Sequence, residues 1–256
     1  MAEPTKTSGI AVIILAAGKG TRMKNPDVAK VMFDVHGKPM IGYAVELAAK
    51  LQAARTMLVV GWQKQSVIDF VSTAYPGVEI VDQEEQRGTG HAVMQTVGPL
   101  KEFDGDLLLL SGDVPLLTEK TAKALLGYHR MSDAAATILT AELPDPTGYG
   151  RIVRNDDGSV KKIVEQKEGS PQELAIREIN SGSYVFDKQR LFDCLPQLSD
   201  NNAPGEYYLT DVFELYWKNN WRVSAVKVID PIEVMGINDS NQLEIARDVM
   251  ASRTAP

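Results

Sequence analysis

The stretch from Ile10 to Lys30 constrains the fold of this chain more than any other, because a strand pattern runs directly into a glycine loop there. Its opening residues, I-A-V-I-I-L, are apolar and mostly β-branched, which is typical of a strand buried on both faces of a parallel sheet. The loop A-A-G-K-G and the cations Arg22 and Lys30 follow. Such a loop exposes backbone N–H groups to an anion, and the cations neutralise its charge. We therefore predict a polyphosphate site.

Other interpretations of this loop are weaker. A dinucleotide-binding fingerprint needs a third glycine where this sequence has Met23, and a P-loop needs a Lys-Ser/Thr pair that is missing. When the loop is considered alone, an ordinary surface turn whose cations face water remains the alternative interpretation.

Composition narrows the class of protein. The chain has 256 residues, of which 44% are hydrophobic and 24% charged, as in globular proteins with a full core. A net charge of −7 argues against a nucleic-acid surface. No apolar run is long enough for a membrane span. The single cysteine, Cys194, excludes an internal disulfide and fits a reducing compartment, so we expect a buried thiol and a cytoplasmic protein without nucleic-acid or membrane partners.

The first half of the chain alternates between strand and helix patterns. Strands are expected at 10–15, 31–35, 57–60 and 78–81, and helices after Pro39 and over 63–73. This order predicts a parallel sheet with right-handed crossovers.

A second glycine pair, Gly88 and Gly90, brackets Thr89 before an expected helix over 92–97. The arrangement suits another anion or a base edge. His91 at this helix start is expected to be structural, because no cluster of His or Cys accompanies it.

The most hydrophobic strand is expected over 106–110 and ends in S-G-D-V-P-L. Asp113 therefore follows the carboxyl end of a buried strand, where open α/β sheets bind ligands. A carboxylate beside a phosphate loop is a natural ligand for a divalent cation. A simple turn cap before Pro115 is the alternative.

Beyond a helix over 118–130, strands are expected at 135–141, 151–154, 160–165 and 183–186, as an inserted, partly antiparallel layer. Its loops mix polar and aromatic residues, including Tyr149 and Tyr207, as a sugar site requires. A late strand over 223–229 precedes a last helix, for which Ser240 is the expected N-cap.

Taken together, these motifs resemble those of the sugar nucleotidyltransferase superfamily, most closely the uridylyltransferase domain of bacterial bifunctional N-acetylglucosamine-1-phosphate uridylyltransferases. The resemblance runs from about Ile10 to Ile245. It rests on L-A-A-G-K-G-T-R-M, Q-E-E-Q-R-G-T-G-H-A, G-D-V-P-L, D-P-T-G-Y-G-R-I, E-I-N-S-G, G-E-Y-Y-L-T-D and G-I-N.

The resemblance implies a Rossmann-like nucleotidyltransferase fold, with a mostly parallel central sheet flanked by helices and an inserted antiparallel sugar-binding layer. It implies one domain over 1–256, with a nucleotide-binding part at 9–131, a sugar-binding part at 132–238 and a helix at 240–253. Catalytic roles would fall to Arg22, Lys30 and Asp113, and Mg²⁺ would bind Asp113 and Asn238. Nucleotide contacts would come from Leu15, Ala16, Ala17, Gly18, Gln83, Gly88, Thr89, Ser111 and Gly112. Sugar contacts would come from Gly150, Glu165, Asn180, Tyr208 and Thr210.

The implied reaction transfers a uridylyl group from UTP to N-acetylglucosamine 1-phosphate. Another sugar or base, or a non-catalytic sensor of nucleotide sugars, stays open. One departure is Asp239-Ser240, where the family usually has Asn-Arg. The bifunctional relatives are held as trimers largely by a β-helix domain, which this sequence does not contain. We therefore expect a monomer or a weak dimer.

Overall fold

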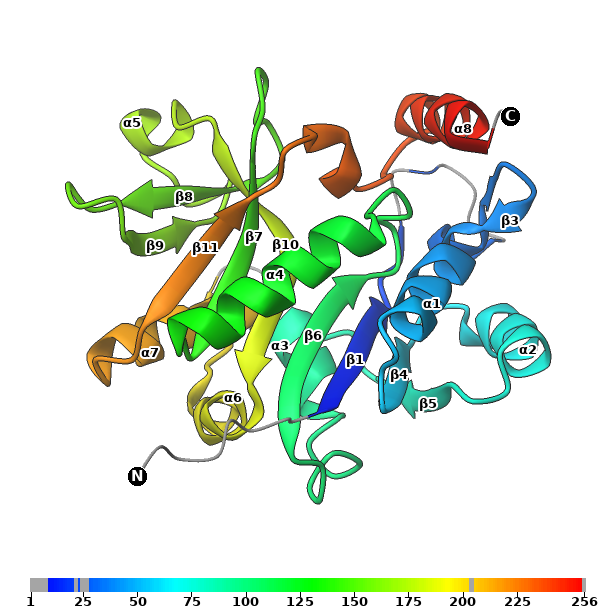
Figure 1. Ribbon diagram of the computed structural model, residues 1–256, viewed down its shortest axis with the longest axis horizontal. Helices are drawn as coiled ribbons and strands as arrows, with labels where there is room; N and C mark the ends of the chain where they lie inside the picture. The colour runs from blue at the N-terminus through cyan, green and yellow to red at the C-terminus, as the bar shows by residue number, and fades with distance from the viewer. Residues whose placement is uncertain (1–8, 21–22, 24–27, 203–204, 255–256) are drawn as a thin grey trace.

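The computed structural model describes residues 9–20, 23, 28–202 and 205–254. The predicted α/β class is confirmed, because a mostly parallel sheet is flanked by helices on both faces (Figure 1). Among the described helices, none is long and apolar enough to cross a membrane.

Strand β1 (Gly9–Ala16) lies inside this sheet, parallel to β4 (Arg55–Val60) on one side and β6 (Gly105–Ser111) on the other. Its alternate side chains enter separate cores on opposite faces, Ile10, Val12 and Ile14 on one and Ala11 and Ile13 on the other. The predicted double burial is therefore confirmed, and it explains why the strand is apolar at every position.

The strand order in the described sheet is β11-β7-β10-β6-β1-β4-β5, and β8 and β9 extend it beside β10. The remaining strands of this sheet are β5 (Glu79–Asp82), β7 (Ala136–Glu142), β8 (Gly150–Arg154), β9 (Val160–Val164), β10 (Glu178–Asp187) and β11 (Val223–Lys227). A separate small hairpin pairs β2 (Asp34–Val35) with β3 (Lys38–Pro39).

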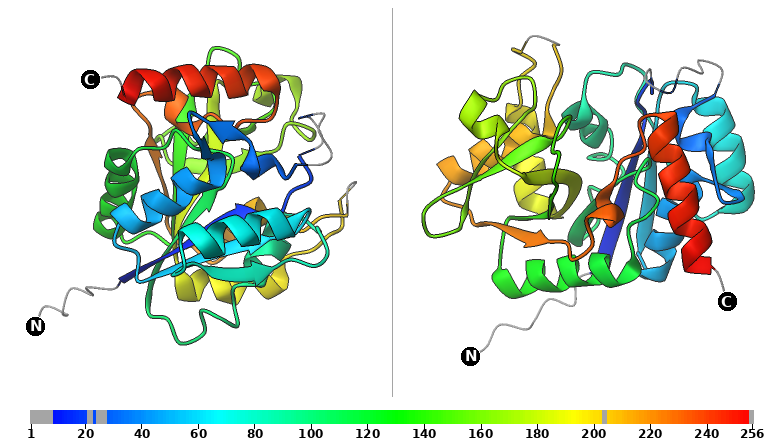
Figure 2. Two further views of the ribbon diagram at one scale, coloured as in Figure 1. Left: turned by 90° about the vertical axis from the view of Figure 1, so that its right-hand side faces the viewer. Right: turned by 90° about the horizontal axis from the view of Figure 1, so that it is seen from above.

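Helices cover both faces of the sheet. Helices α1 (Met40–Lys50), α2 (Lys64–Ala74) and α4 (Glu119–Ser132) pack into the first core. Helices α3 (Thr89–Met94), α6 (Lys188–Cys194) and α7 (Val212–Lys218) pack into the second, where Cys194 is buried as expected. Viewed from above, α4 lies on one side of the sheet and α3 and α6 on the other (Figure 2).

Strand β10 joins the two parts of the sheet. It runs antiparallel to β7 along one edge, and along the other edge to β8 near its start and to β6 near its end. The predicted inserted antiparallel strands are present, and β10 joins them to the central sheet. A bulge between Asn180 and Tyr184 interrupts the pairing with β7, and Gly182 there has φ +78°.

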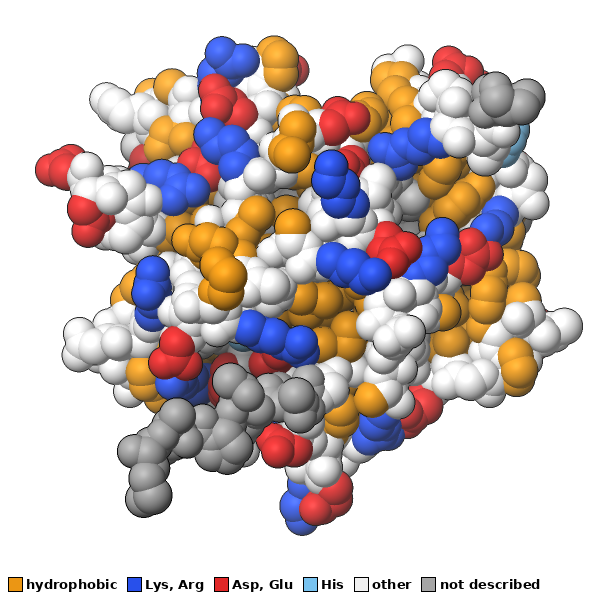
Figure 3. Space-filling model, in the orientation of Figure 1, with side chains coloured by type: hydrophobic (Ala, Val, Ile, Leu, Met, Phe, Trp, Pro, Cys, Tyr) orange, Lys and Arg blue, Asp and Glu red, His pale blue; other side chains and the backbone are white. Residues whose placement is uncertain are grey.

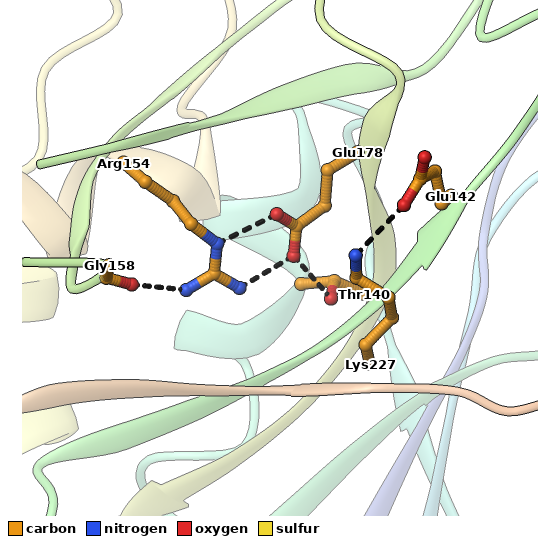
Figure 4. Close-up of polar contacts among 6 residues, drawn as sticks. All are labelled: Thr140, Glu142, Arg154, Gly158, Glu178 and Lys227. Atoms are coloured by element: carbon orange, nitrogen blue, oxygen red, sulfur yellow. Dashed lines mark hydrogen bonds and ion pairs between the residues drawn. The ribbon is translucent and has the colours of Figure 1, made fainter. Parts of the chain in front are cut away.

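A polar cluster fastens the inserted strands to one another (Figure 4). Arg154 on β8 binds Glu178 on β10 with Nε–Oε2 and Nη2–Oε1 distances of 2.7 and 2.6 Å. Thr140 on β7 donates to the same carboxylate, at 2.8 Å. Lys227 on β11 pairs with Glu142 on β7 at 2.9 Å. The Arg154–Glu178 pair ties the β8–β9 hairpin to β10, and the other two contacts tie β7 to β10 and to β11.

Two local predictions are wrong. The expected strand over 31–35 is a 3-10 helix (Lys30–Met32) followed by β2, because only Asp34 and Val35 find a pairing partner. The last helix, α8 (Ser240–Thr254), is capped by Asp239 and not by Ser240, since Asp239 Oδ1 accepts from the N–H of Gln242 at 2.9 Å. Helix α8 packs over a third, smaller core that includes Val35, Leu116 and Ile237.

Short elements in the second half were not predicted. They are α5 (Pro171–Leu174), α6, α7 and the 3-10 helices Leu195–Gln197, Leu209–Asp211 and Pro231–Val234. Acidic and basic side chains are interspersed over the described residues of the face drawn in Figure 3.

Candidate active site

Residues from distant parts of the chain meet at the carboxyl ends of β1 and β6. The Gly112 N–H donates to the Leu15 carbonyl at 2.9 Å, which ties the two strand ends together. The glycine loop begins at Ala17 and passes over the stem of Lys30. A Cβ on Gly20, whose φ is +58°, would lie 2.6 Å from Lys30 Cβ. Glycine is therefore required at position 20 for the loop to pack on Lys30.

Lys30 lies between the two predicted metal ligands. Its Nζ donates to Asp113 Oδ2 and, at 3.0 Å, to Asn238 Oδ1. The side chains of Lys30 and Asp113 are only 15% and 21% exposed, so solvent screens this pair weakly. The predicted meeting of Asp113 and Asn238 is thus observed, with an ammonium between them.

The backbone fixes this geometry. The Ile237 N–H donates to the Asp113 carbonyl at 2.9 Å. Asn238 Nδ2 donates to the Gly236 carbonyl at 3.2 Å, which turns its Oδ1 toward Lys30. Carboxylate and amide oxygens converging on one cation suit a divalent metal ion. Among the described residues no group of three or more His, Cys, Asp or Glu does so, so water or ligand oxygens would complete the coordination.

A cavity of about 460 Å³, here called the loop cavity, opens beside this group. Lys30 and Asp113 line it, together with Lys19, Gln86 and Glu206. All the predicted nucleotide contacts except Gly112 also line it: Leu15, Ala16, Ala17, Gly18, Gln83, Gly88, Thr89 and Ser111. Gly112 is packed instead, since a Cβ there would lie 3.0 Å from Ile41 and 3.1 Å from the Leu15 carbonyl.

The second glycine motif interlocks with the G-E-Y-Y-L-T segment. The Gly90 N–H donates to the Tyr207 carbonyl at 2.8 Å, and Thr89 Oγ1 accepts from the Leu209 N–H at 3.1 Å. A Cβ on Gly88, whose φ is +98°, would lie 2.6 Å from the Tyr207 carbonyl. The glycines thus allow close backbone approach, and Thr89 has a structural contact besides its place in the cavity wall.

Gln83 is buried at the base of the loop cavity, at 3% exposure. Its Nε2 donates to the Gly88 carbonyl at 3.0 Å and lies 3.1 Å from His91 Nδ1. His91 also stacks against Tyr207, with ring centroids 6.3 Å apart. The expected structural role of His91 is consistent with these contacts, which hold the wall of the cavity.

A second cavity, of about 440 Å³ and here called the insert cavity, lies between the central sheet and the β8–β9 hairpin. Its walls include every predicted sugar contact: Gly150, Glu165, Asn180, Tyr208 and Thr210. Further lining residues were not singled out from the sequence: Gly148, Gln166, Lys167, Ser181, Gly182, Tyr184 and Glu206. Most of these residues lie in the same motifs as the predicted sugar contacts. The other polar positions of V-E-Q-K-E and E-I-N-S-G were the sequence signal that could have identified them.

Polar groups inside the insert cavity already have protein partners. Thr210 Oγ1 donates to Glu165 Oε1 at 3.1 Å. Burial raises the pKa of Glu165, the Thr210 hydrogen bond opposes this shift, and the charge of Glu168 adds to it. Asn180 Nδ2 donates to the Tyr184 hydroxyl at 2.7 Å, and Asn180 Oδ1 accepts from the Gly182 N–H at 3.2 Å. The Asn180 amide is therefore oriented by the bulge in β10.

The two cavities share a wall made of Leu15, Thr89, Ser111 and Glu206. Ligands in the two cavities would therefore meet at this wall, near the group formed by Lys30, Asp113 and Asn238. Arg22, the other predicted catalytic cation, lies outside the described residues.

Comparison with known proteins agrees with this geometry. The model of the nucleotidyl transferase family matches residues 11–230. The chain belongs to this family. Nucleotidyl transferases generally use a divalent metal ion, and the oxygens of Asp113 and Asn238 are suitable ligands for one.

Several curated relatives of this nucleotidyl transferase carry the name bifunctional protein GlmU. That of Lactobacillus delbrueckii subsp. bulgaricus is 46% identical over 242 residues, which cover 94% of this chain and 52% of the relative. That of Latilactobacillus sakei is 47% identical over 241 residues, 94% of this chain and 51% of the relative. That of Geobacillus thermodenitrificans is 46% identical over 241 residues, 94% of this chain and 52% of the relative. The chain spans about half the length of these curated relatives.

Proposed function

We propose that this nucleotidyl transferase transfers a uridylyl group from UTP to N-acetylglucosamine 1-phosphate, giving UDP-N-acetylglucosamine and pyrophosphate. One observation carries the proposal: the loop cavity and the insert cavity share a wall beside Lys30 and Asp113. The first has the glycine backbone and cations that suit a triphosphate, and the second has the hydroxyl, carboxylate and aromatic groups that suit a sugar.

The reaction needs alignment and charge neutralisation more than proton transfer. An anionic oxygen of the sugar phosphate attacks the α-phosphorus of UTP, one P–O bond forms, and the P–O bond to pyrophosphate breaks. Because the nucleophile is already charged, no general base is required. Preorganised cations and N–H groups are then the main source of catalysis.

Asp113 and Asn238 would hold a divalent ion, and we propose Mg²⁺, which prefers a few protein oxygens together with phosphate oxygens. When bound there, the ion supplies Lewis-acid stabilisation of the phosphate charge and a template for alignment. Lys30 occupies the position between the two ligand oxygens. We propose that its ammonium leaves this position when the site is loaded and binds a phosphate oxygen.

Arg22 is proposed to face the departing pyrophosphate, on the basis of the sequence motif. The nucleotide base is proposed to lie against Gln83 and Gly88, and the sugar against Glu165, Asn180 and Thr210. We propose one domain, working in the cytoplasm as a monomer or weak dimer.

The test is a pyrophosphate-release assay with each nucleoside triphosphate against a panel of sugar 1-phosphates, with and without EDTA. UTP with N-acetylglucosamine 1-phosphate should be used best, EDTA should abolish turnover, and Mg²⁺ should restore it. Asp113→Ala should lose at least about 10²–10³ in kcat, as when one preorganised group is removed from a transition state. Better use of another pair would replace the proposed substrates, and absence of turnover with every pair would favour a sensor.

A further inference from the structure

Gln166 joins two loops that line the insert cavity. Its Oε1 accepts from the Gly148 N–H at 3.0 Å and from Arg151 Nη2 at 2.9 Å. Gly148 belongs to the turn before β8, whereas Gln166 follows β9. The side chain thus spans the open end of the hairpin beside Gly150 and Glu165, which both line the cavity.

These contacts fix the orientation of the Gln166 carboxamide. Both partners are N–H donors, so the atom that faces them must be the oxygen. The nitrogen, Nε2, therefore points away from Gly148 and Arg151. It makes no hydrogen bond to any described residue and is not sealed from solvent, and Gln166 lines the insert cavity.

Arg151 is what holds Gln166 in this orientation. It is 2% exposed and forms no ion pair with a described residue, although the charge of Asp145 acts on it. Its Nη1 donates to the Tyr149 carbonyl, its Nη2 to Gln166, and its Nε has no partner among the described residues. Burying a guanidinium without an ion-pair partner lowers the free energy of unfolding, because its hydration is lost. Among the described residues, its side-chain hydrogen bonds all go to the two loops of the insert cavity, so these loops are where the cost of its burial is offset.

We propose that Gln166 is a sugar-binding residue that donates its Nε2–H to an acceptor oxygen of the sugar, and that Arg151 is its positioning residue. The proposal rests on the proposed function, in that the insert cavity receives the sugar. Glu165 in the same wall is an acceptor when ionised. With a fixed donor beside it, the cavity can bind both the hydrogen-bond donor and the acceptor of a hydroxyl or acetamido group.

Gln166→Glu is the sharpest test, because it separates the two halves of the side chain. A glutamate keeps an oxygen for Gly148 and gains an ion pair with Arg151, so the loops should stay in place. The donor is lost. We expect the KM for the sugar 1-phosphate to rise about tenfold or more and the KM for UTP to change less than about twofold. The melting temperature should be unchanged or higher. Gln172→Glu, which adds the same charge on exposed α5, is the matched control and should behave as the unmodified protein.

Gln166→Glu could raise the KM in two ways, through loss of the donor or through repulsion between the new carboxylate and the sugar phosphate. A panel of sugar 1-phosphates distinguishes these two causes. The 1-phosphates of N-acetylglucosamine, glucosamine, glucose and 2-deoxyglucose differ only in the group at C2, and that of galactose differs from that of glucose only in the orientation of the C4 hydroxyl. The penalty from Gln166→Glu should shrink about tenfold for the analogue that lacks the acceptor, which the unmodified protein should also use poorly. An equal penalty on all sugars, or none, would overturn the donor role.

Arg151→Lys tests the positioning role. It should raise the KM for the sugar 1-phosphate and not that for UTP, and it should add little in the Gln166→Glu background. Additive effects of the two substitutions would contradict positioning through Gln166. If Arg151→Lys does not fold, the Gln166 variants still decide the donor role. Absence of turnover by the unmodified protein with every sugar would instead reject the proposed function.

Discussion

The backbone N–H of Ile237 donates a 2.9 Å hydrogen bond to the carbonyl oxygen of Asp113, joining the late G-I-N loop to the end of β6. The bond ties the backbones of the two segments together, and the Gln242 carboxamide, which accepts from the Asn238 N–H at 2.7 Å, holds Asn238 in place beside it. The two ligand oxygens are therefore in place before a metal ion arrives. Lys30 fills the position between them and is not needed to create it.

This relationship gives an unusual expectation for Lys30→Met. Removing the ammonium should tighten binding of Mn²⁺ to the protein alone by up to about fivefold, because a partly exposed competing charge is worth up to about 1 kcal/mol. Turnover should nevertheless fall about 10²–10³-fold. Electron paramagnetic resonance of free Mn²⁺ measures the first effect independently of activity. Lys227→Met, whose ammonium pairs with Glu142 elsewhere, should change neither. Weaker Mn²⁺ binding by Lys30→Met would mean that Lys30 supports the ligands.

Gly88 is expected to tolerate no side chain. Alanine there would need φ near +98° and would bring its Cβ to 2.6 Å from the Tyr207 carbonyl. We expect Gly88→Ala to lower the free energy of unfolding by about 2–4 kcal/mol and to raise the KM for the nucleotide. Gly98→Ala is the control, since a Cβ at Gly98 meets nothing within 4 Å. Urea unfolding of both variants checks the difference, and equal stabilities would contradict this account of the motif.

The Arg154–Glu178 pair should stabilise the β8–β9 hairpin in a pH-dependent way. Burial pushes the pKa of Glu178 up, but hydrogen bonds from Arg154 and Thr140 and the Arg154 charge bring it below the usual value. A lowered acid pKa stabilises the fold at higher pH, and this stability disappears as pH falls through the folded-state pKa. Arg154→Met should therefore cost about 1–3 kcal/mol at pH 7 and less near pH 4.

Chemical denaturation at several pH values measures that dependence. Lys218→Met, which breaks an ion pair with both partners about two thirds exposed, at 65% and 68%, should cost under about 0.5 kcal/mol throughout. A deficit in Arg154→Met that stays constant down to pH 4 would show that the ion pair is not its source.

Asp211 should destabilise the native protein at neutral pH. Burial and the charges of Glu168, Glu214 and Glu165 raise its pKa to about 6. A raised acid pKa means that the folded state binds more protons between about pH 4 and 6, so stability falls as pH rises through that range. Asp211→Asn should therefore be more stable at pH 7 by about 1 kcal/mol after allowance for solvent screening. Thermal melts from pH 4 to 8 measure this, and a gain that persists at pH 4 would point to another cause.

The parts of the fold that were predicted depend on local patterns. The apolar run of β1 and the glycines after it determine a buried strand and a loop within twenty residues, and the structure has both. Asp113 was recognised because it follows a very hydrophobic strand. The insert cavity could be assembled because each of its walls carries its own motif, which the family resemblance connects.

The parts that were missed depend on tertiary contacts or on very short segments. The place of Lys30 between Asp113 and Asn238 requires three distant segments to be brought together, and no spacing encodes that. The Asn180 amide is oriented by a bulge that only the pairing of β10 with β7 reveals. Helix α5 is too short for a hydrophobic period, although its Ser170–Glu173 capping box was visible in the sequence.

The position of β10 has a consequence for how the molecule comes apart. Its backbone is bonded to β7 along one edge and to β6 and β8 along the other, so the central strands and the inserted strands cannot separate without losing one of these ladders. Heat or denaturant should then melt the two cavities together in a single cooperative transition, with amide protons of β1 and β7 exchanging through the same global opening. A substrate bound in either cavity would protect both from unfolding.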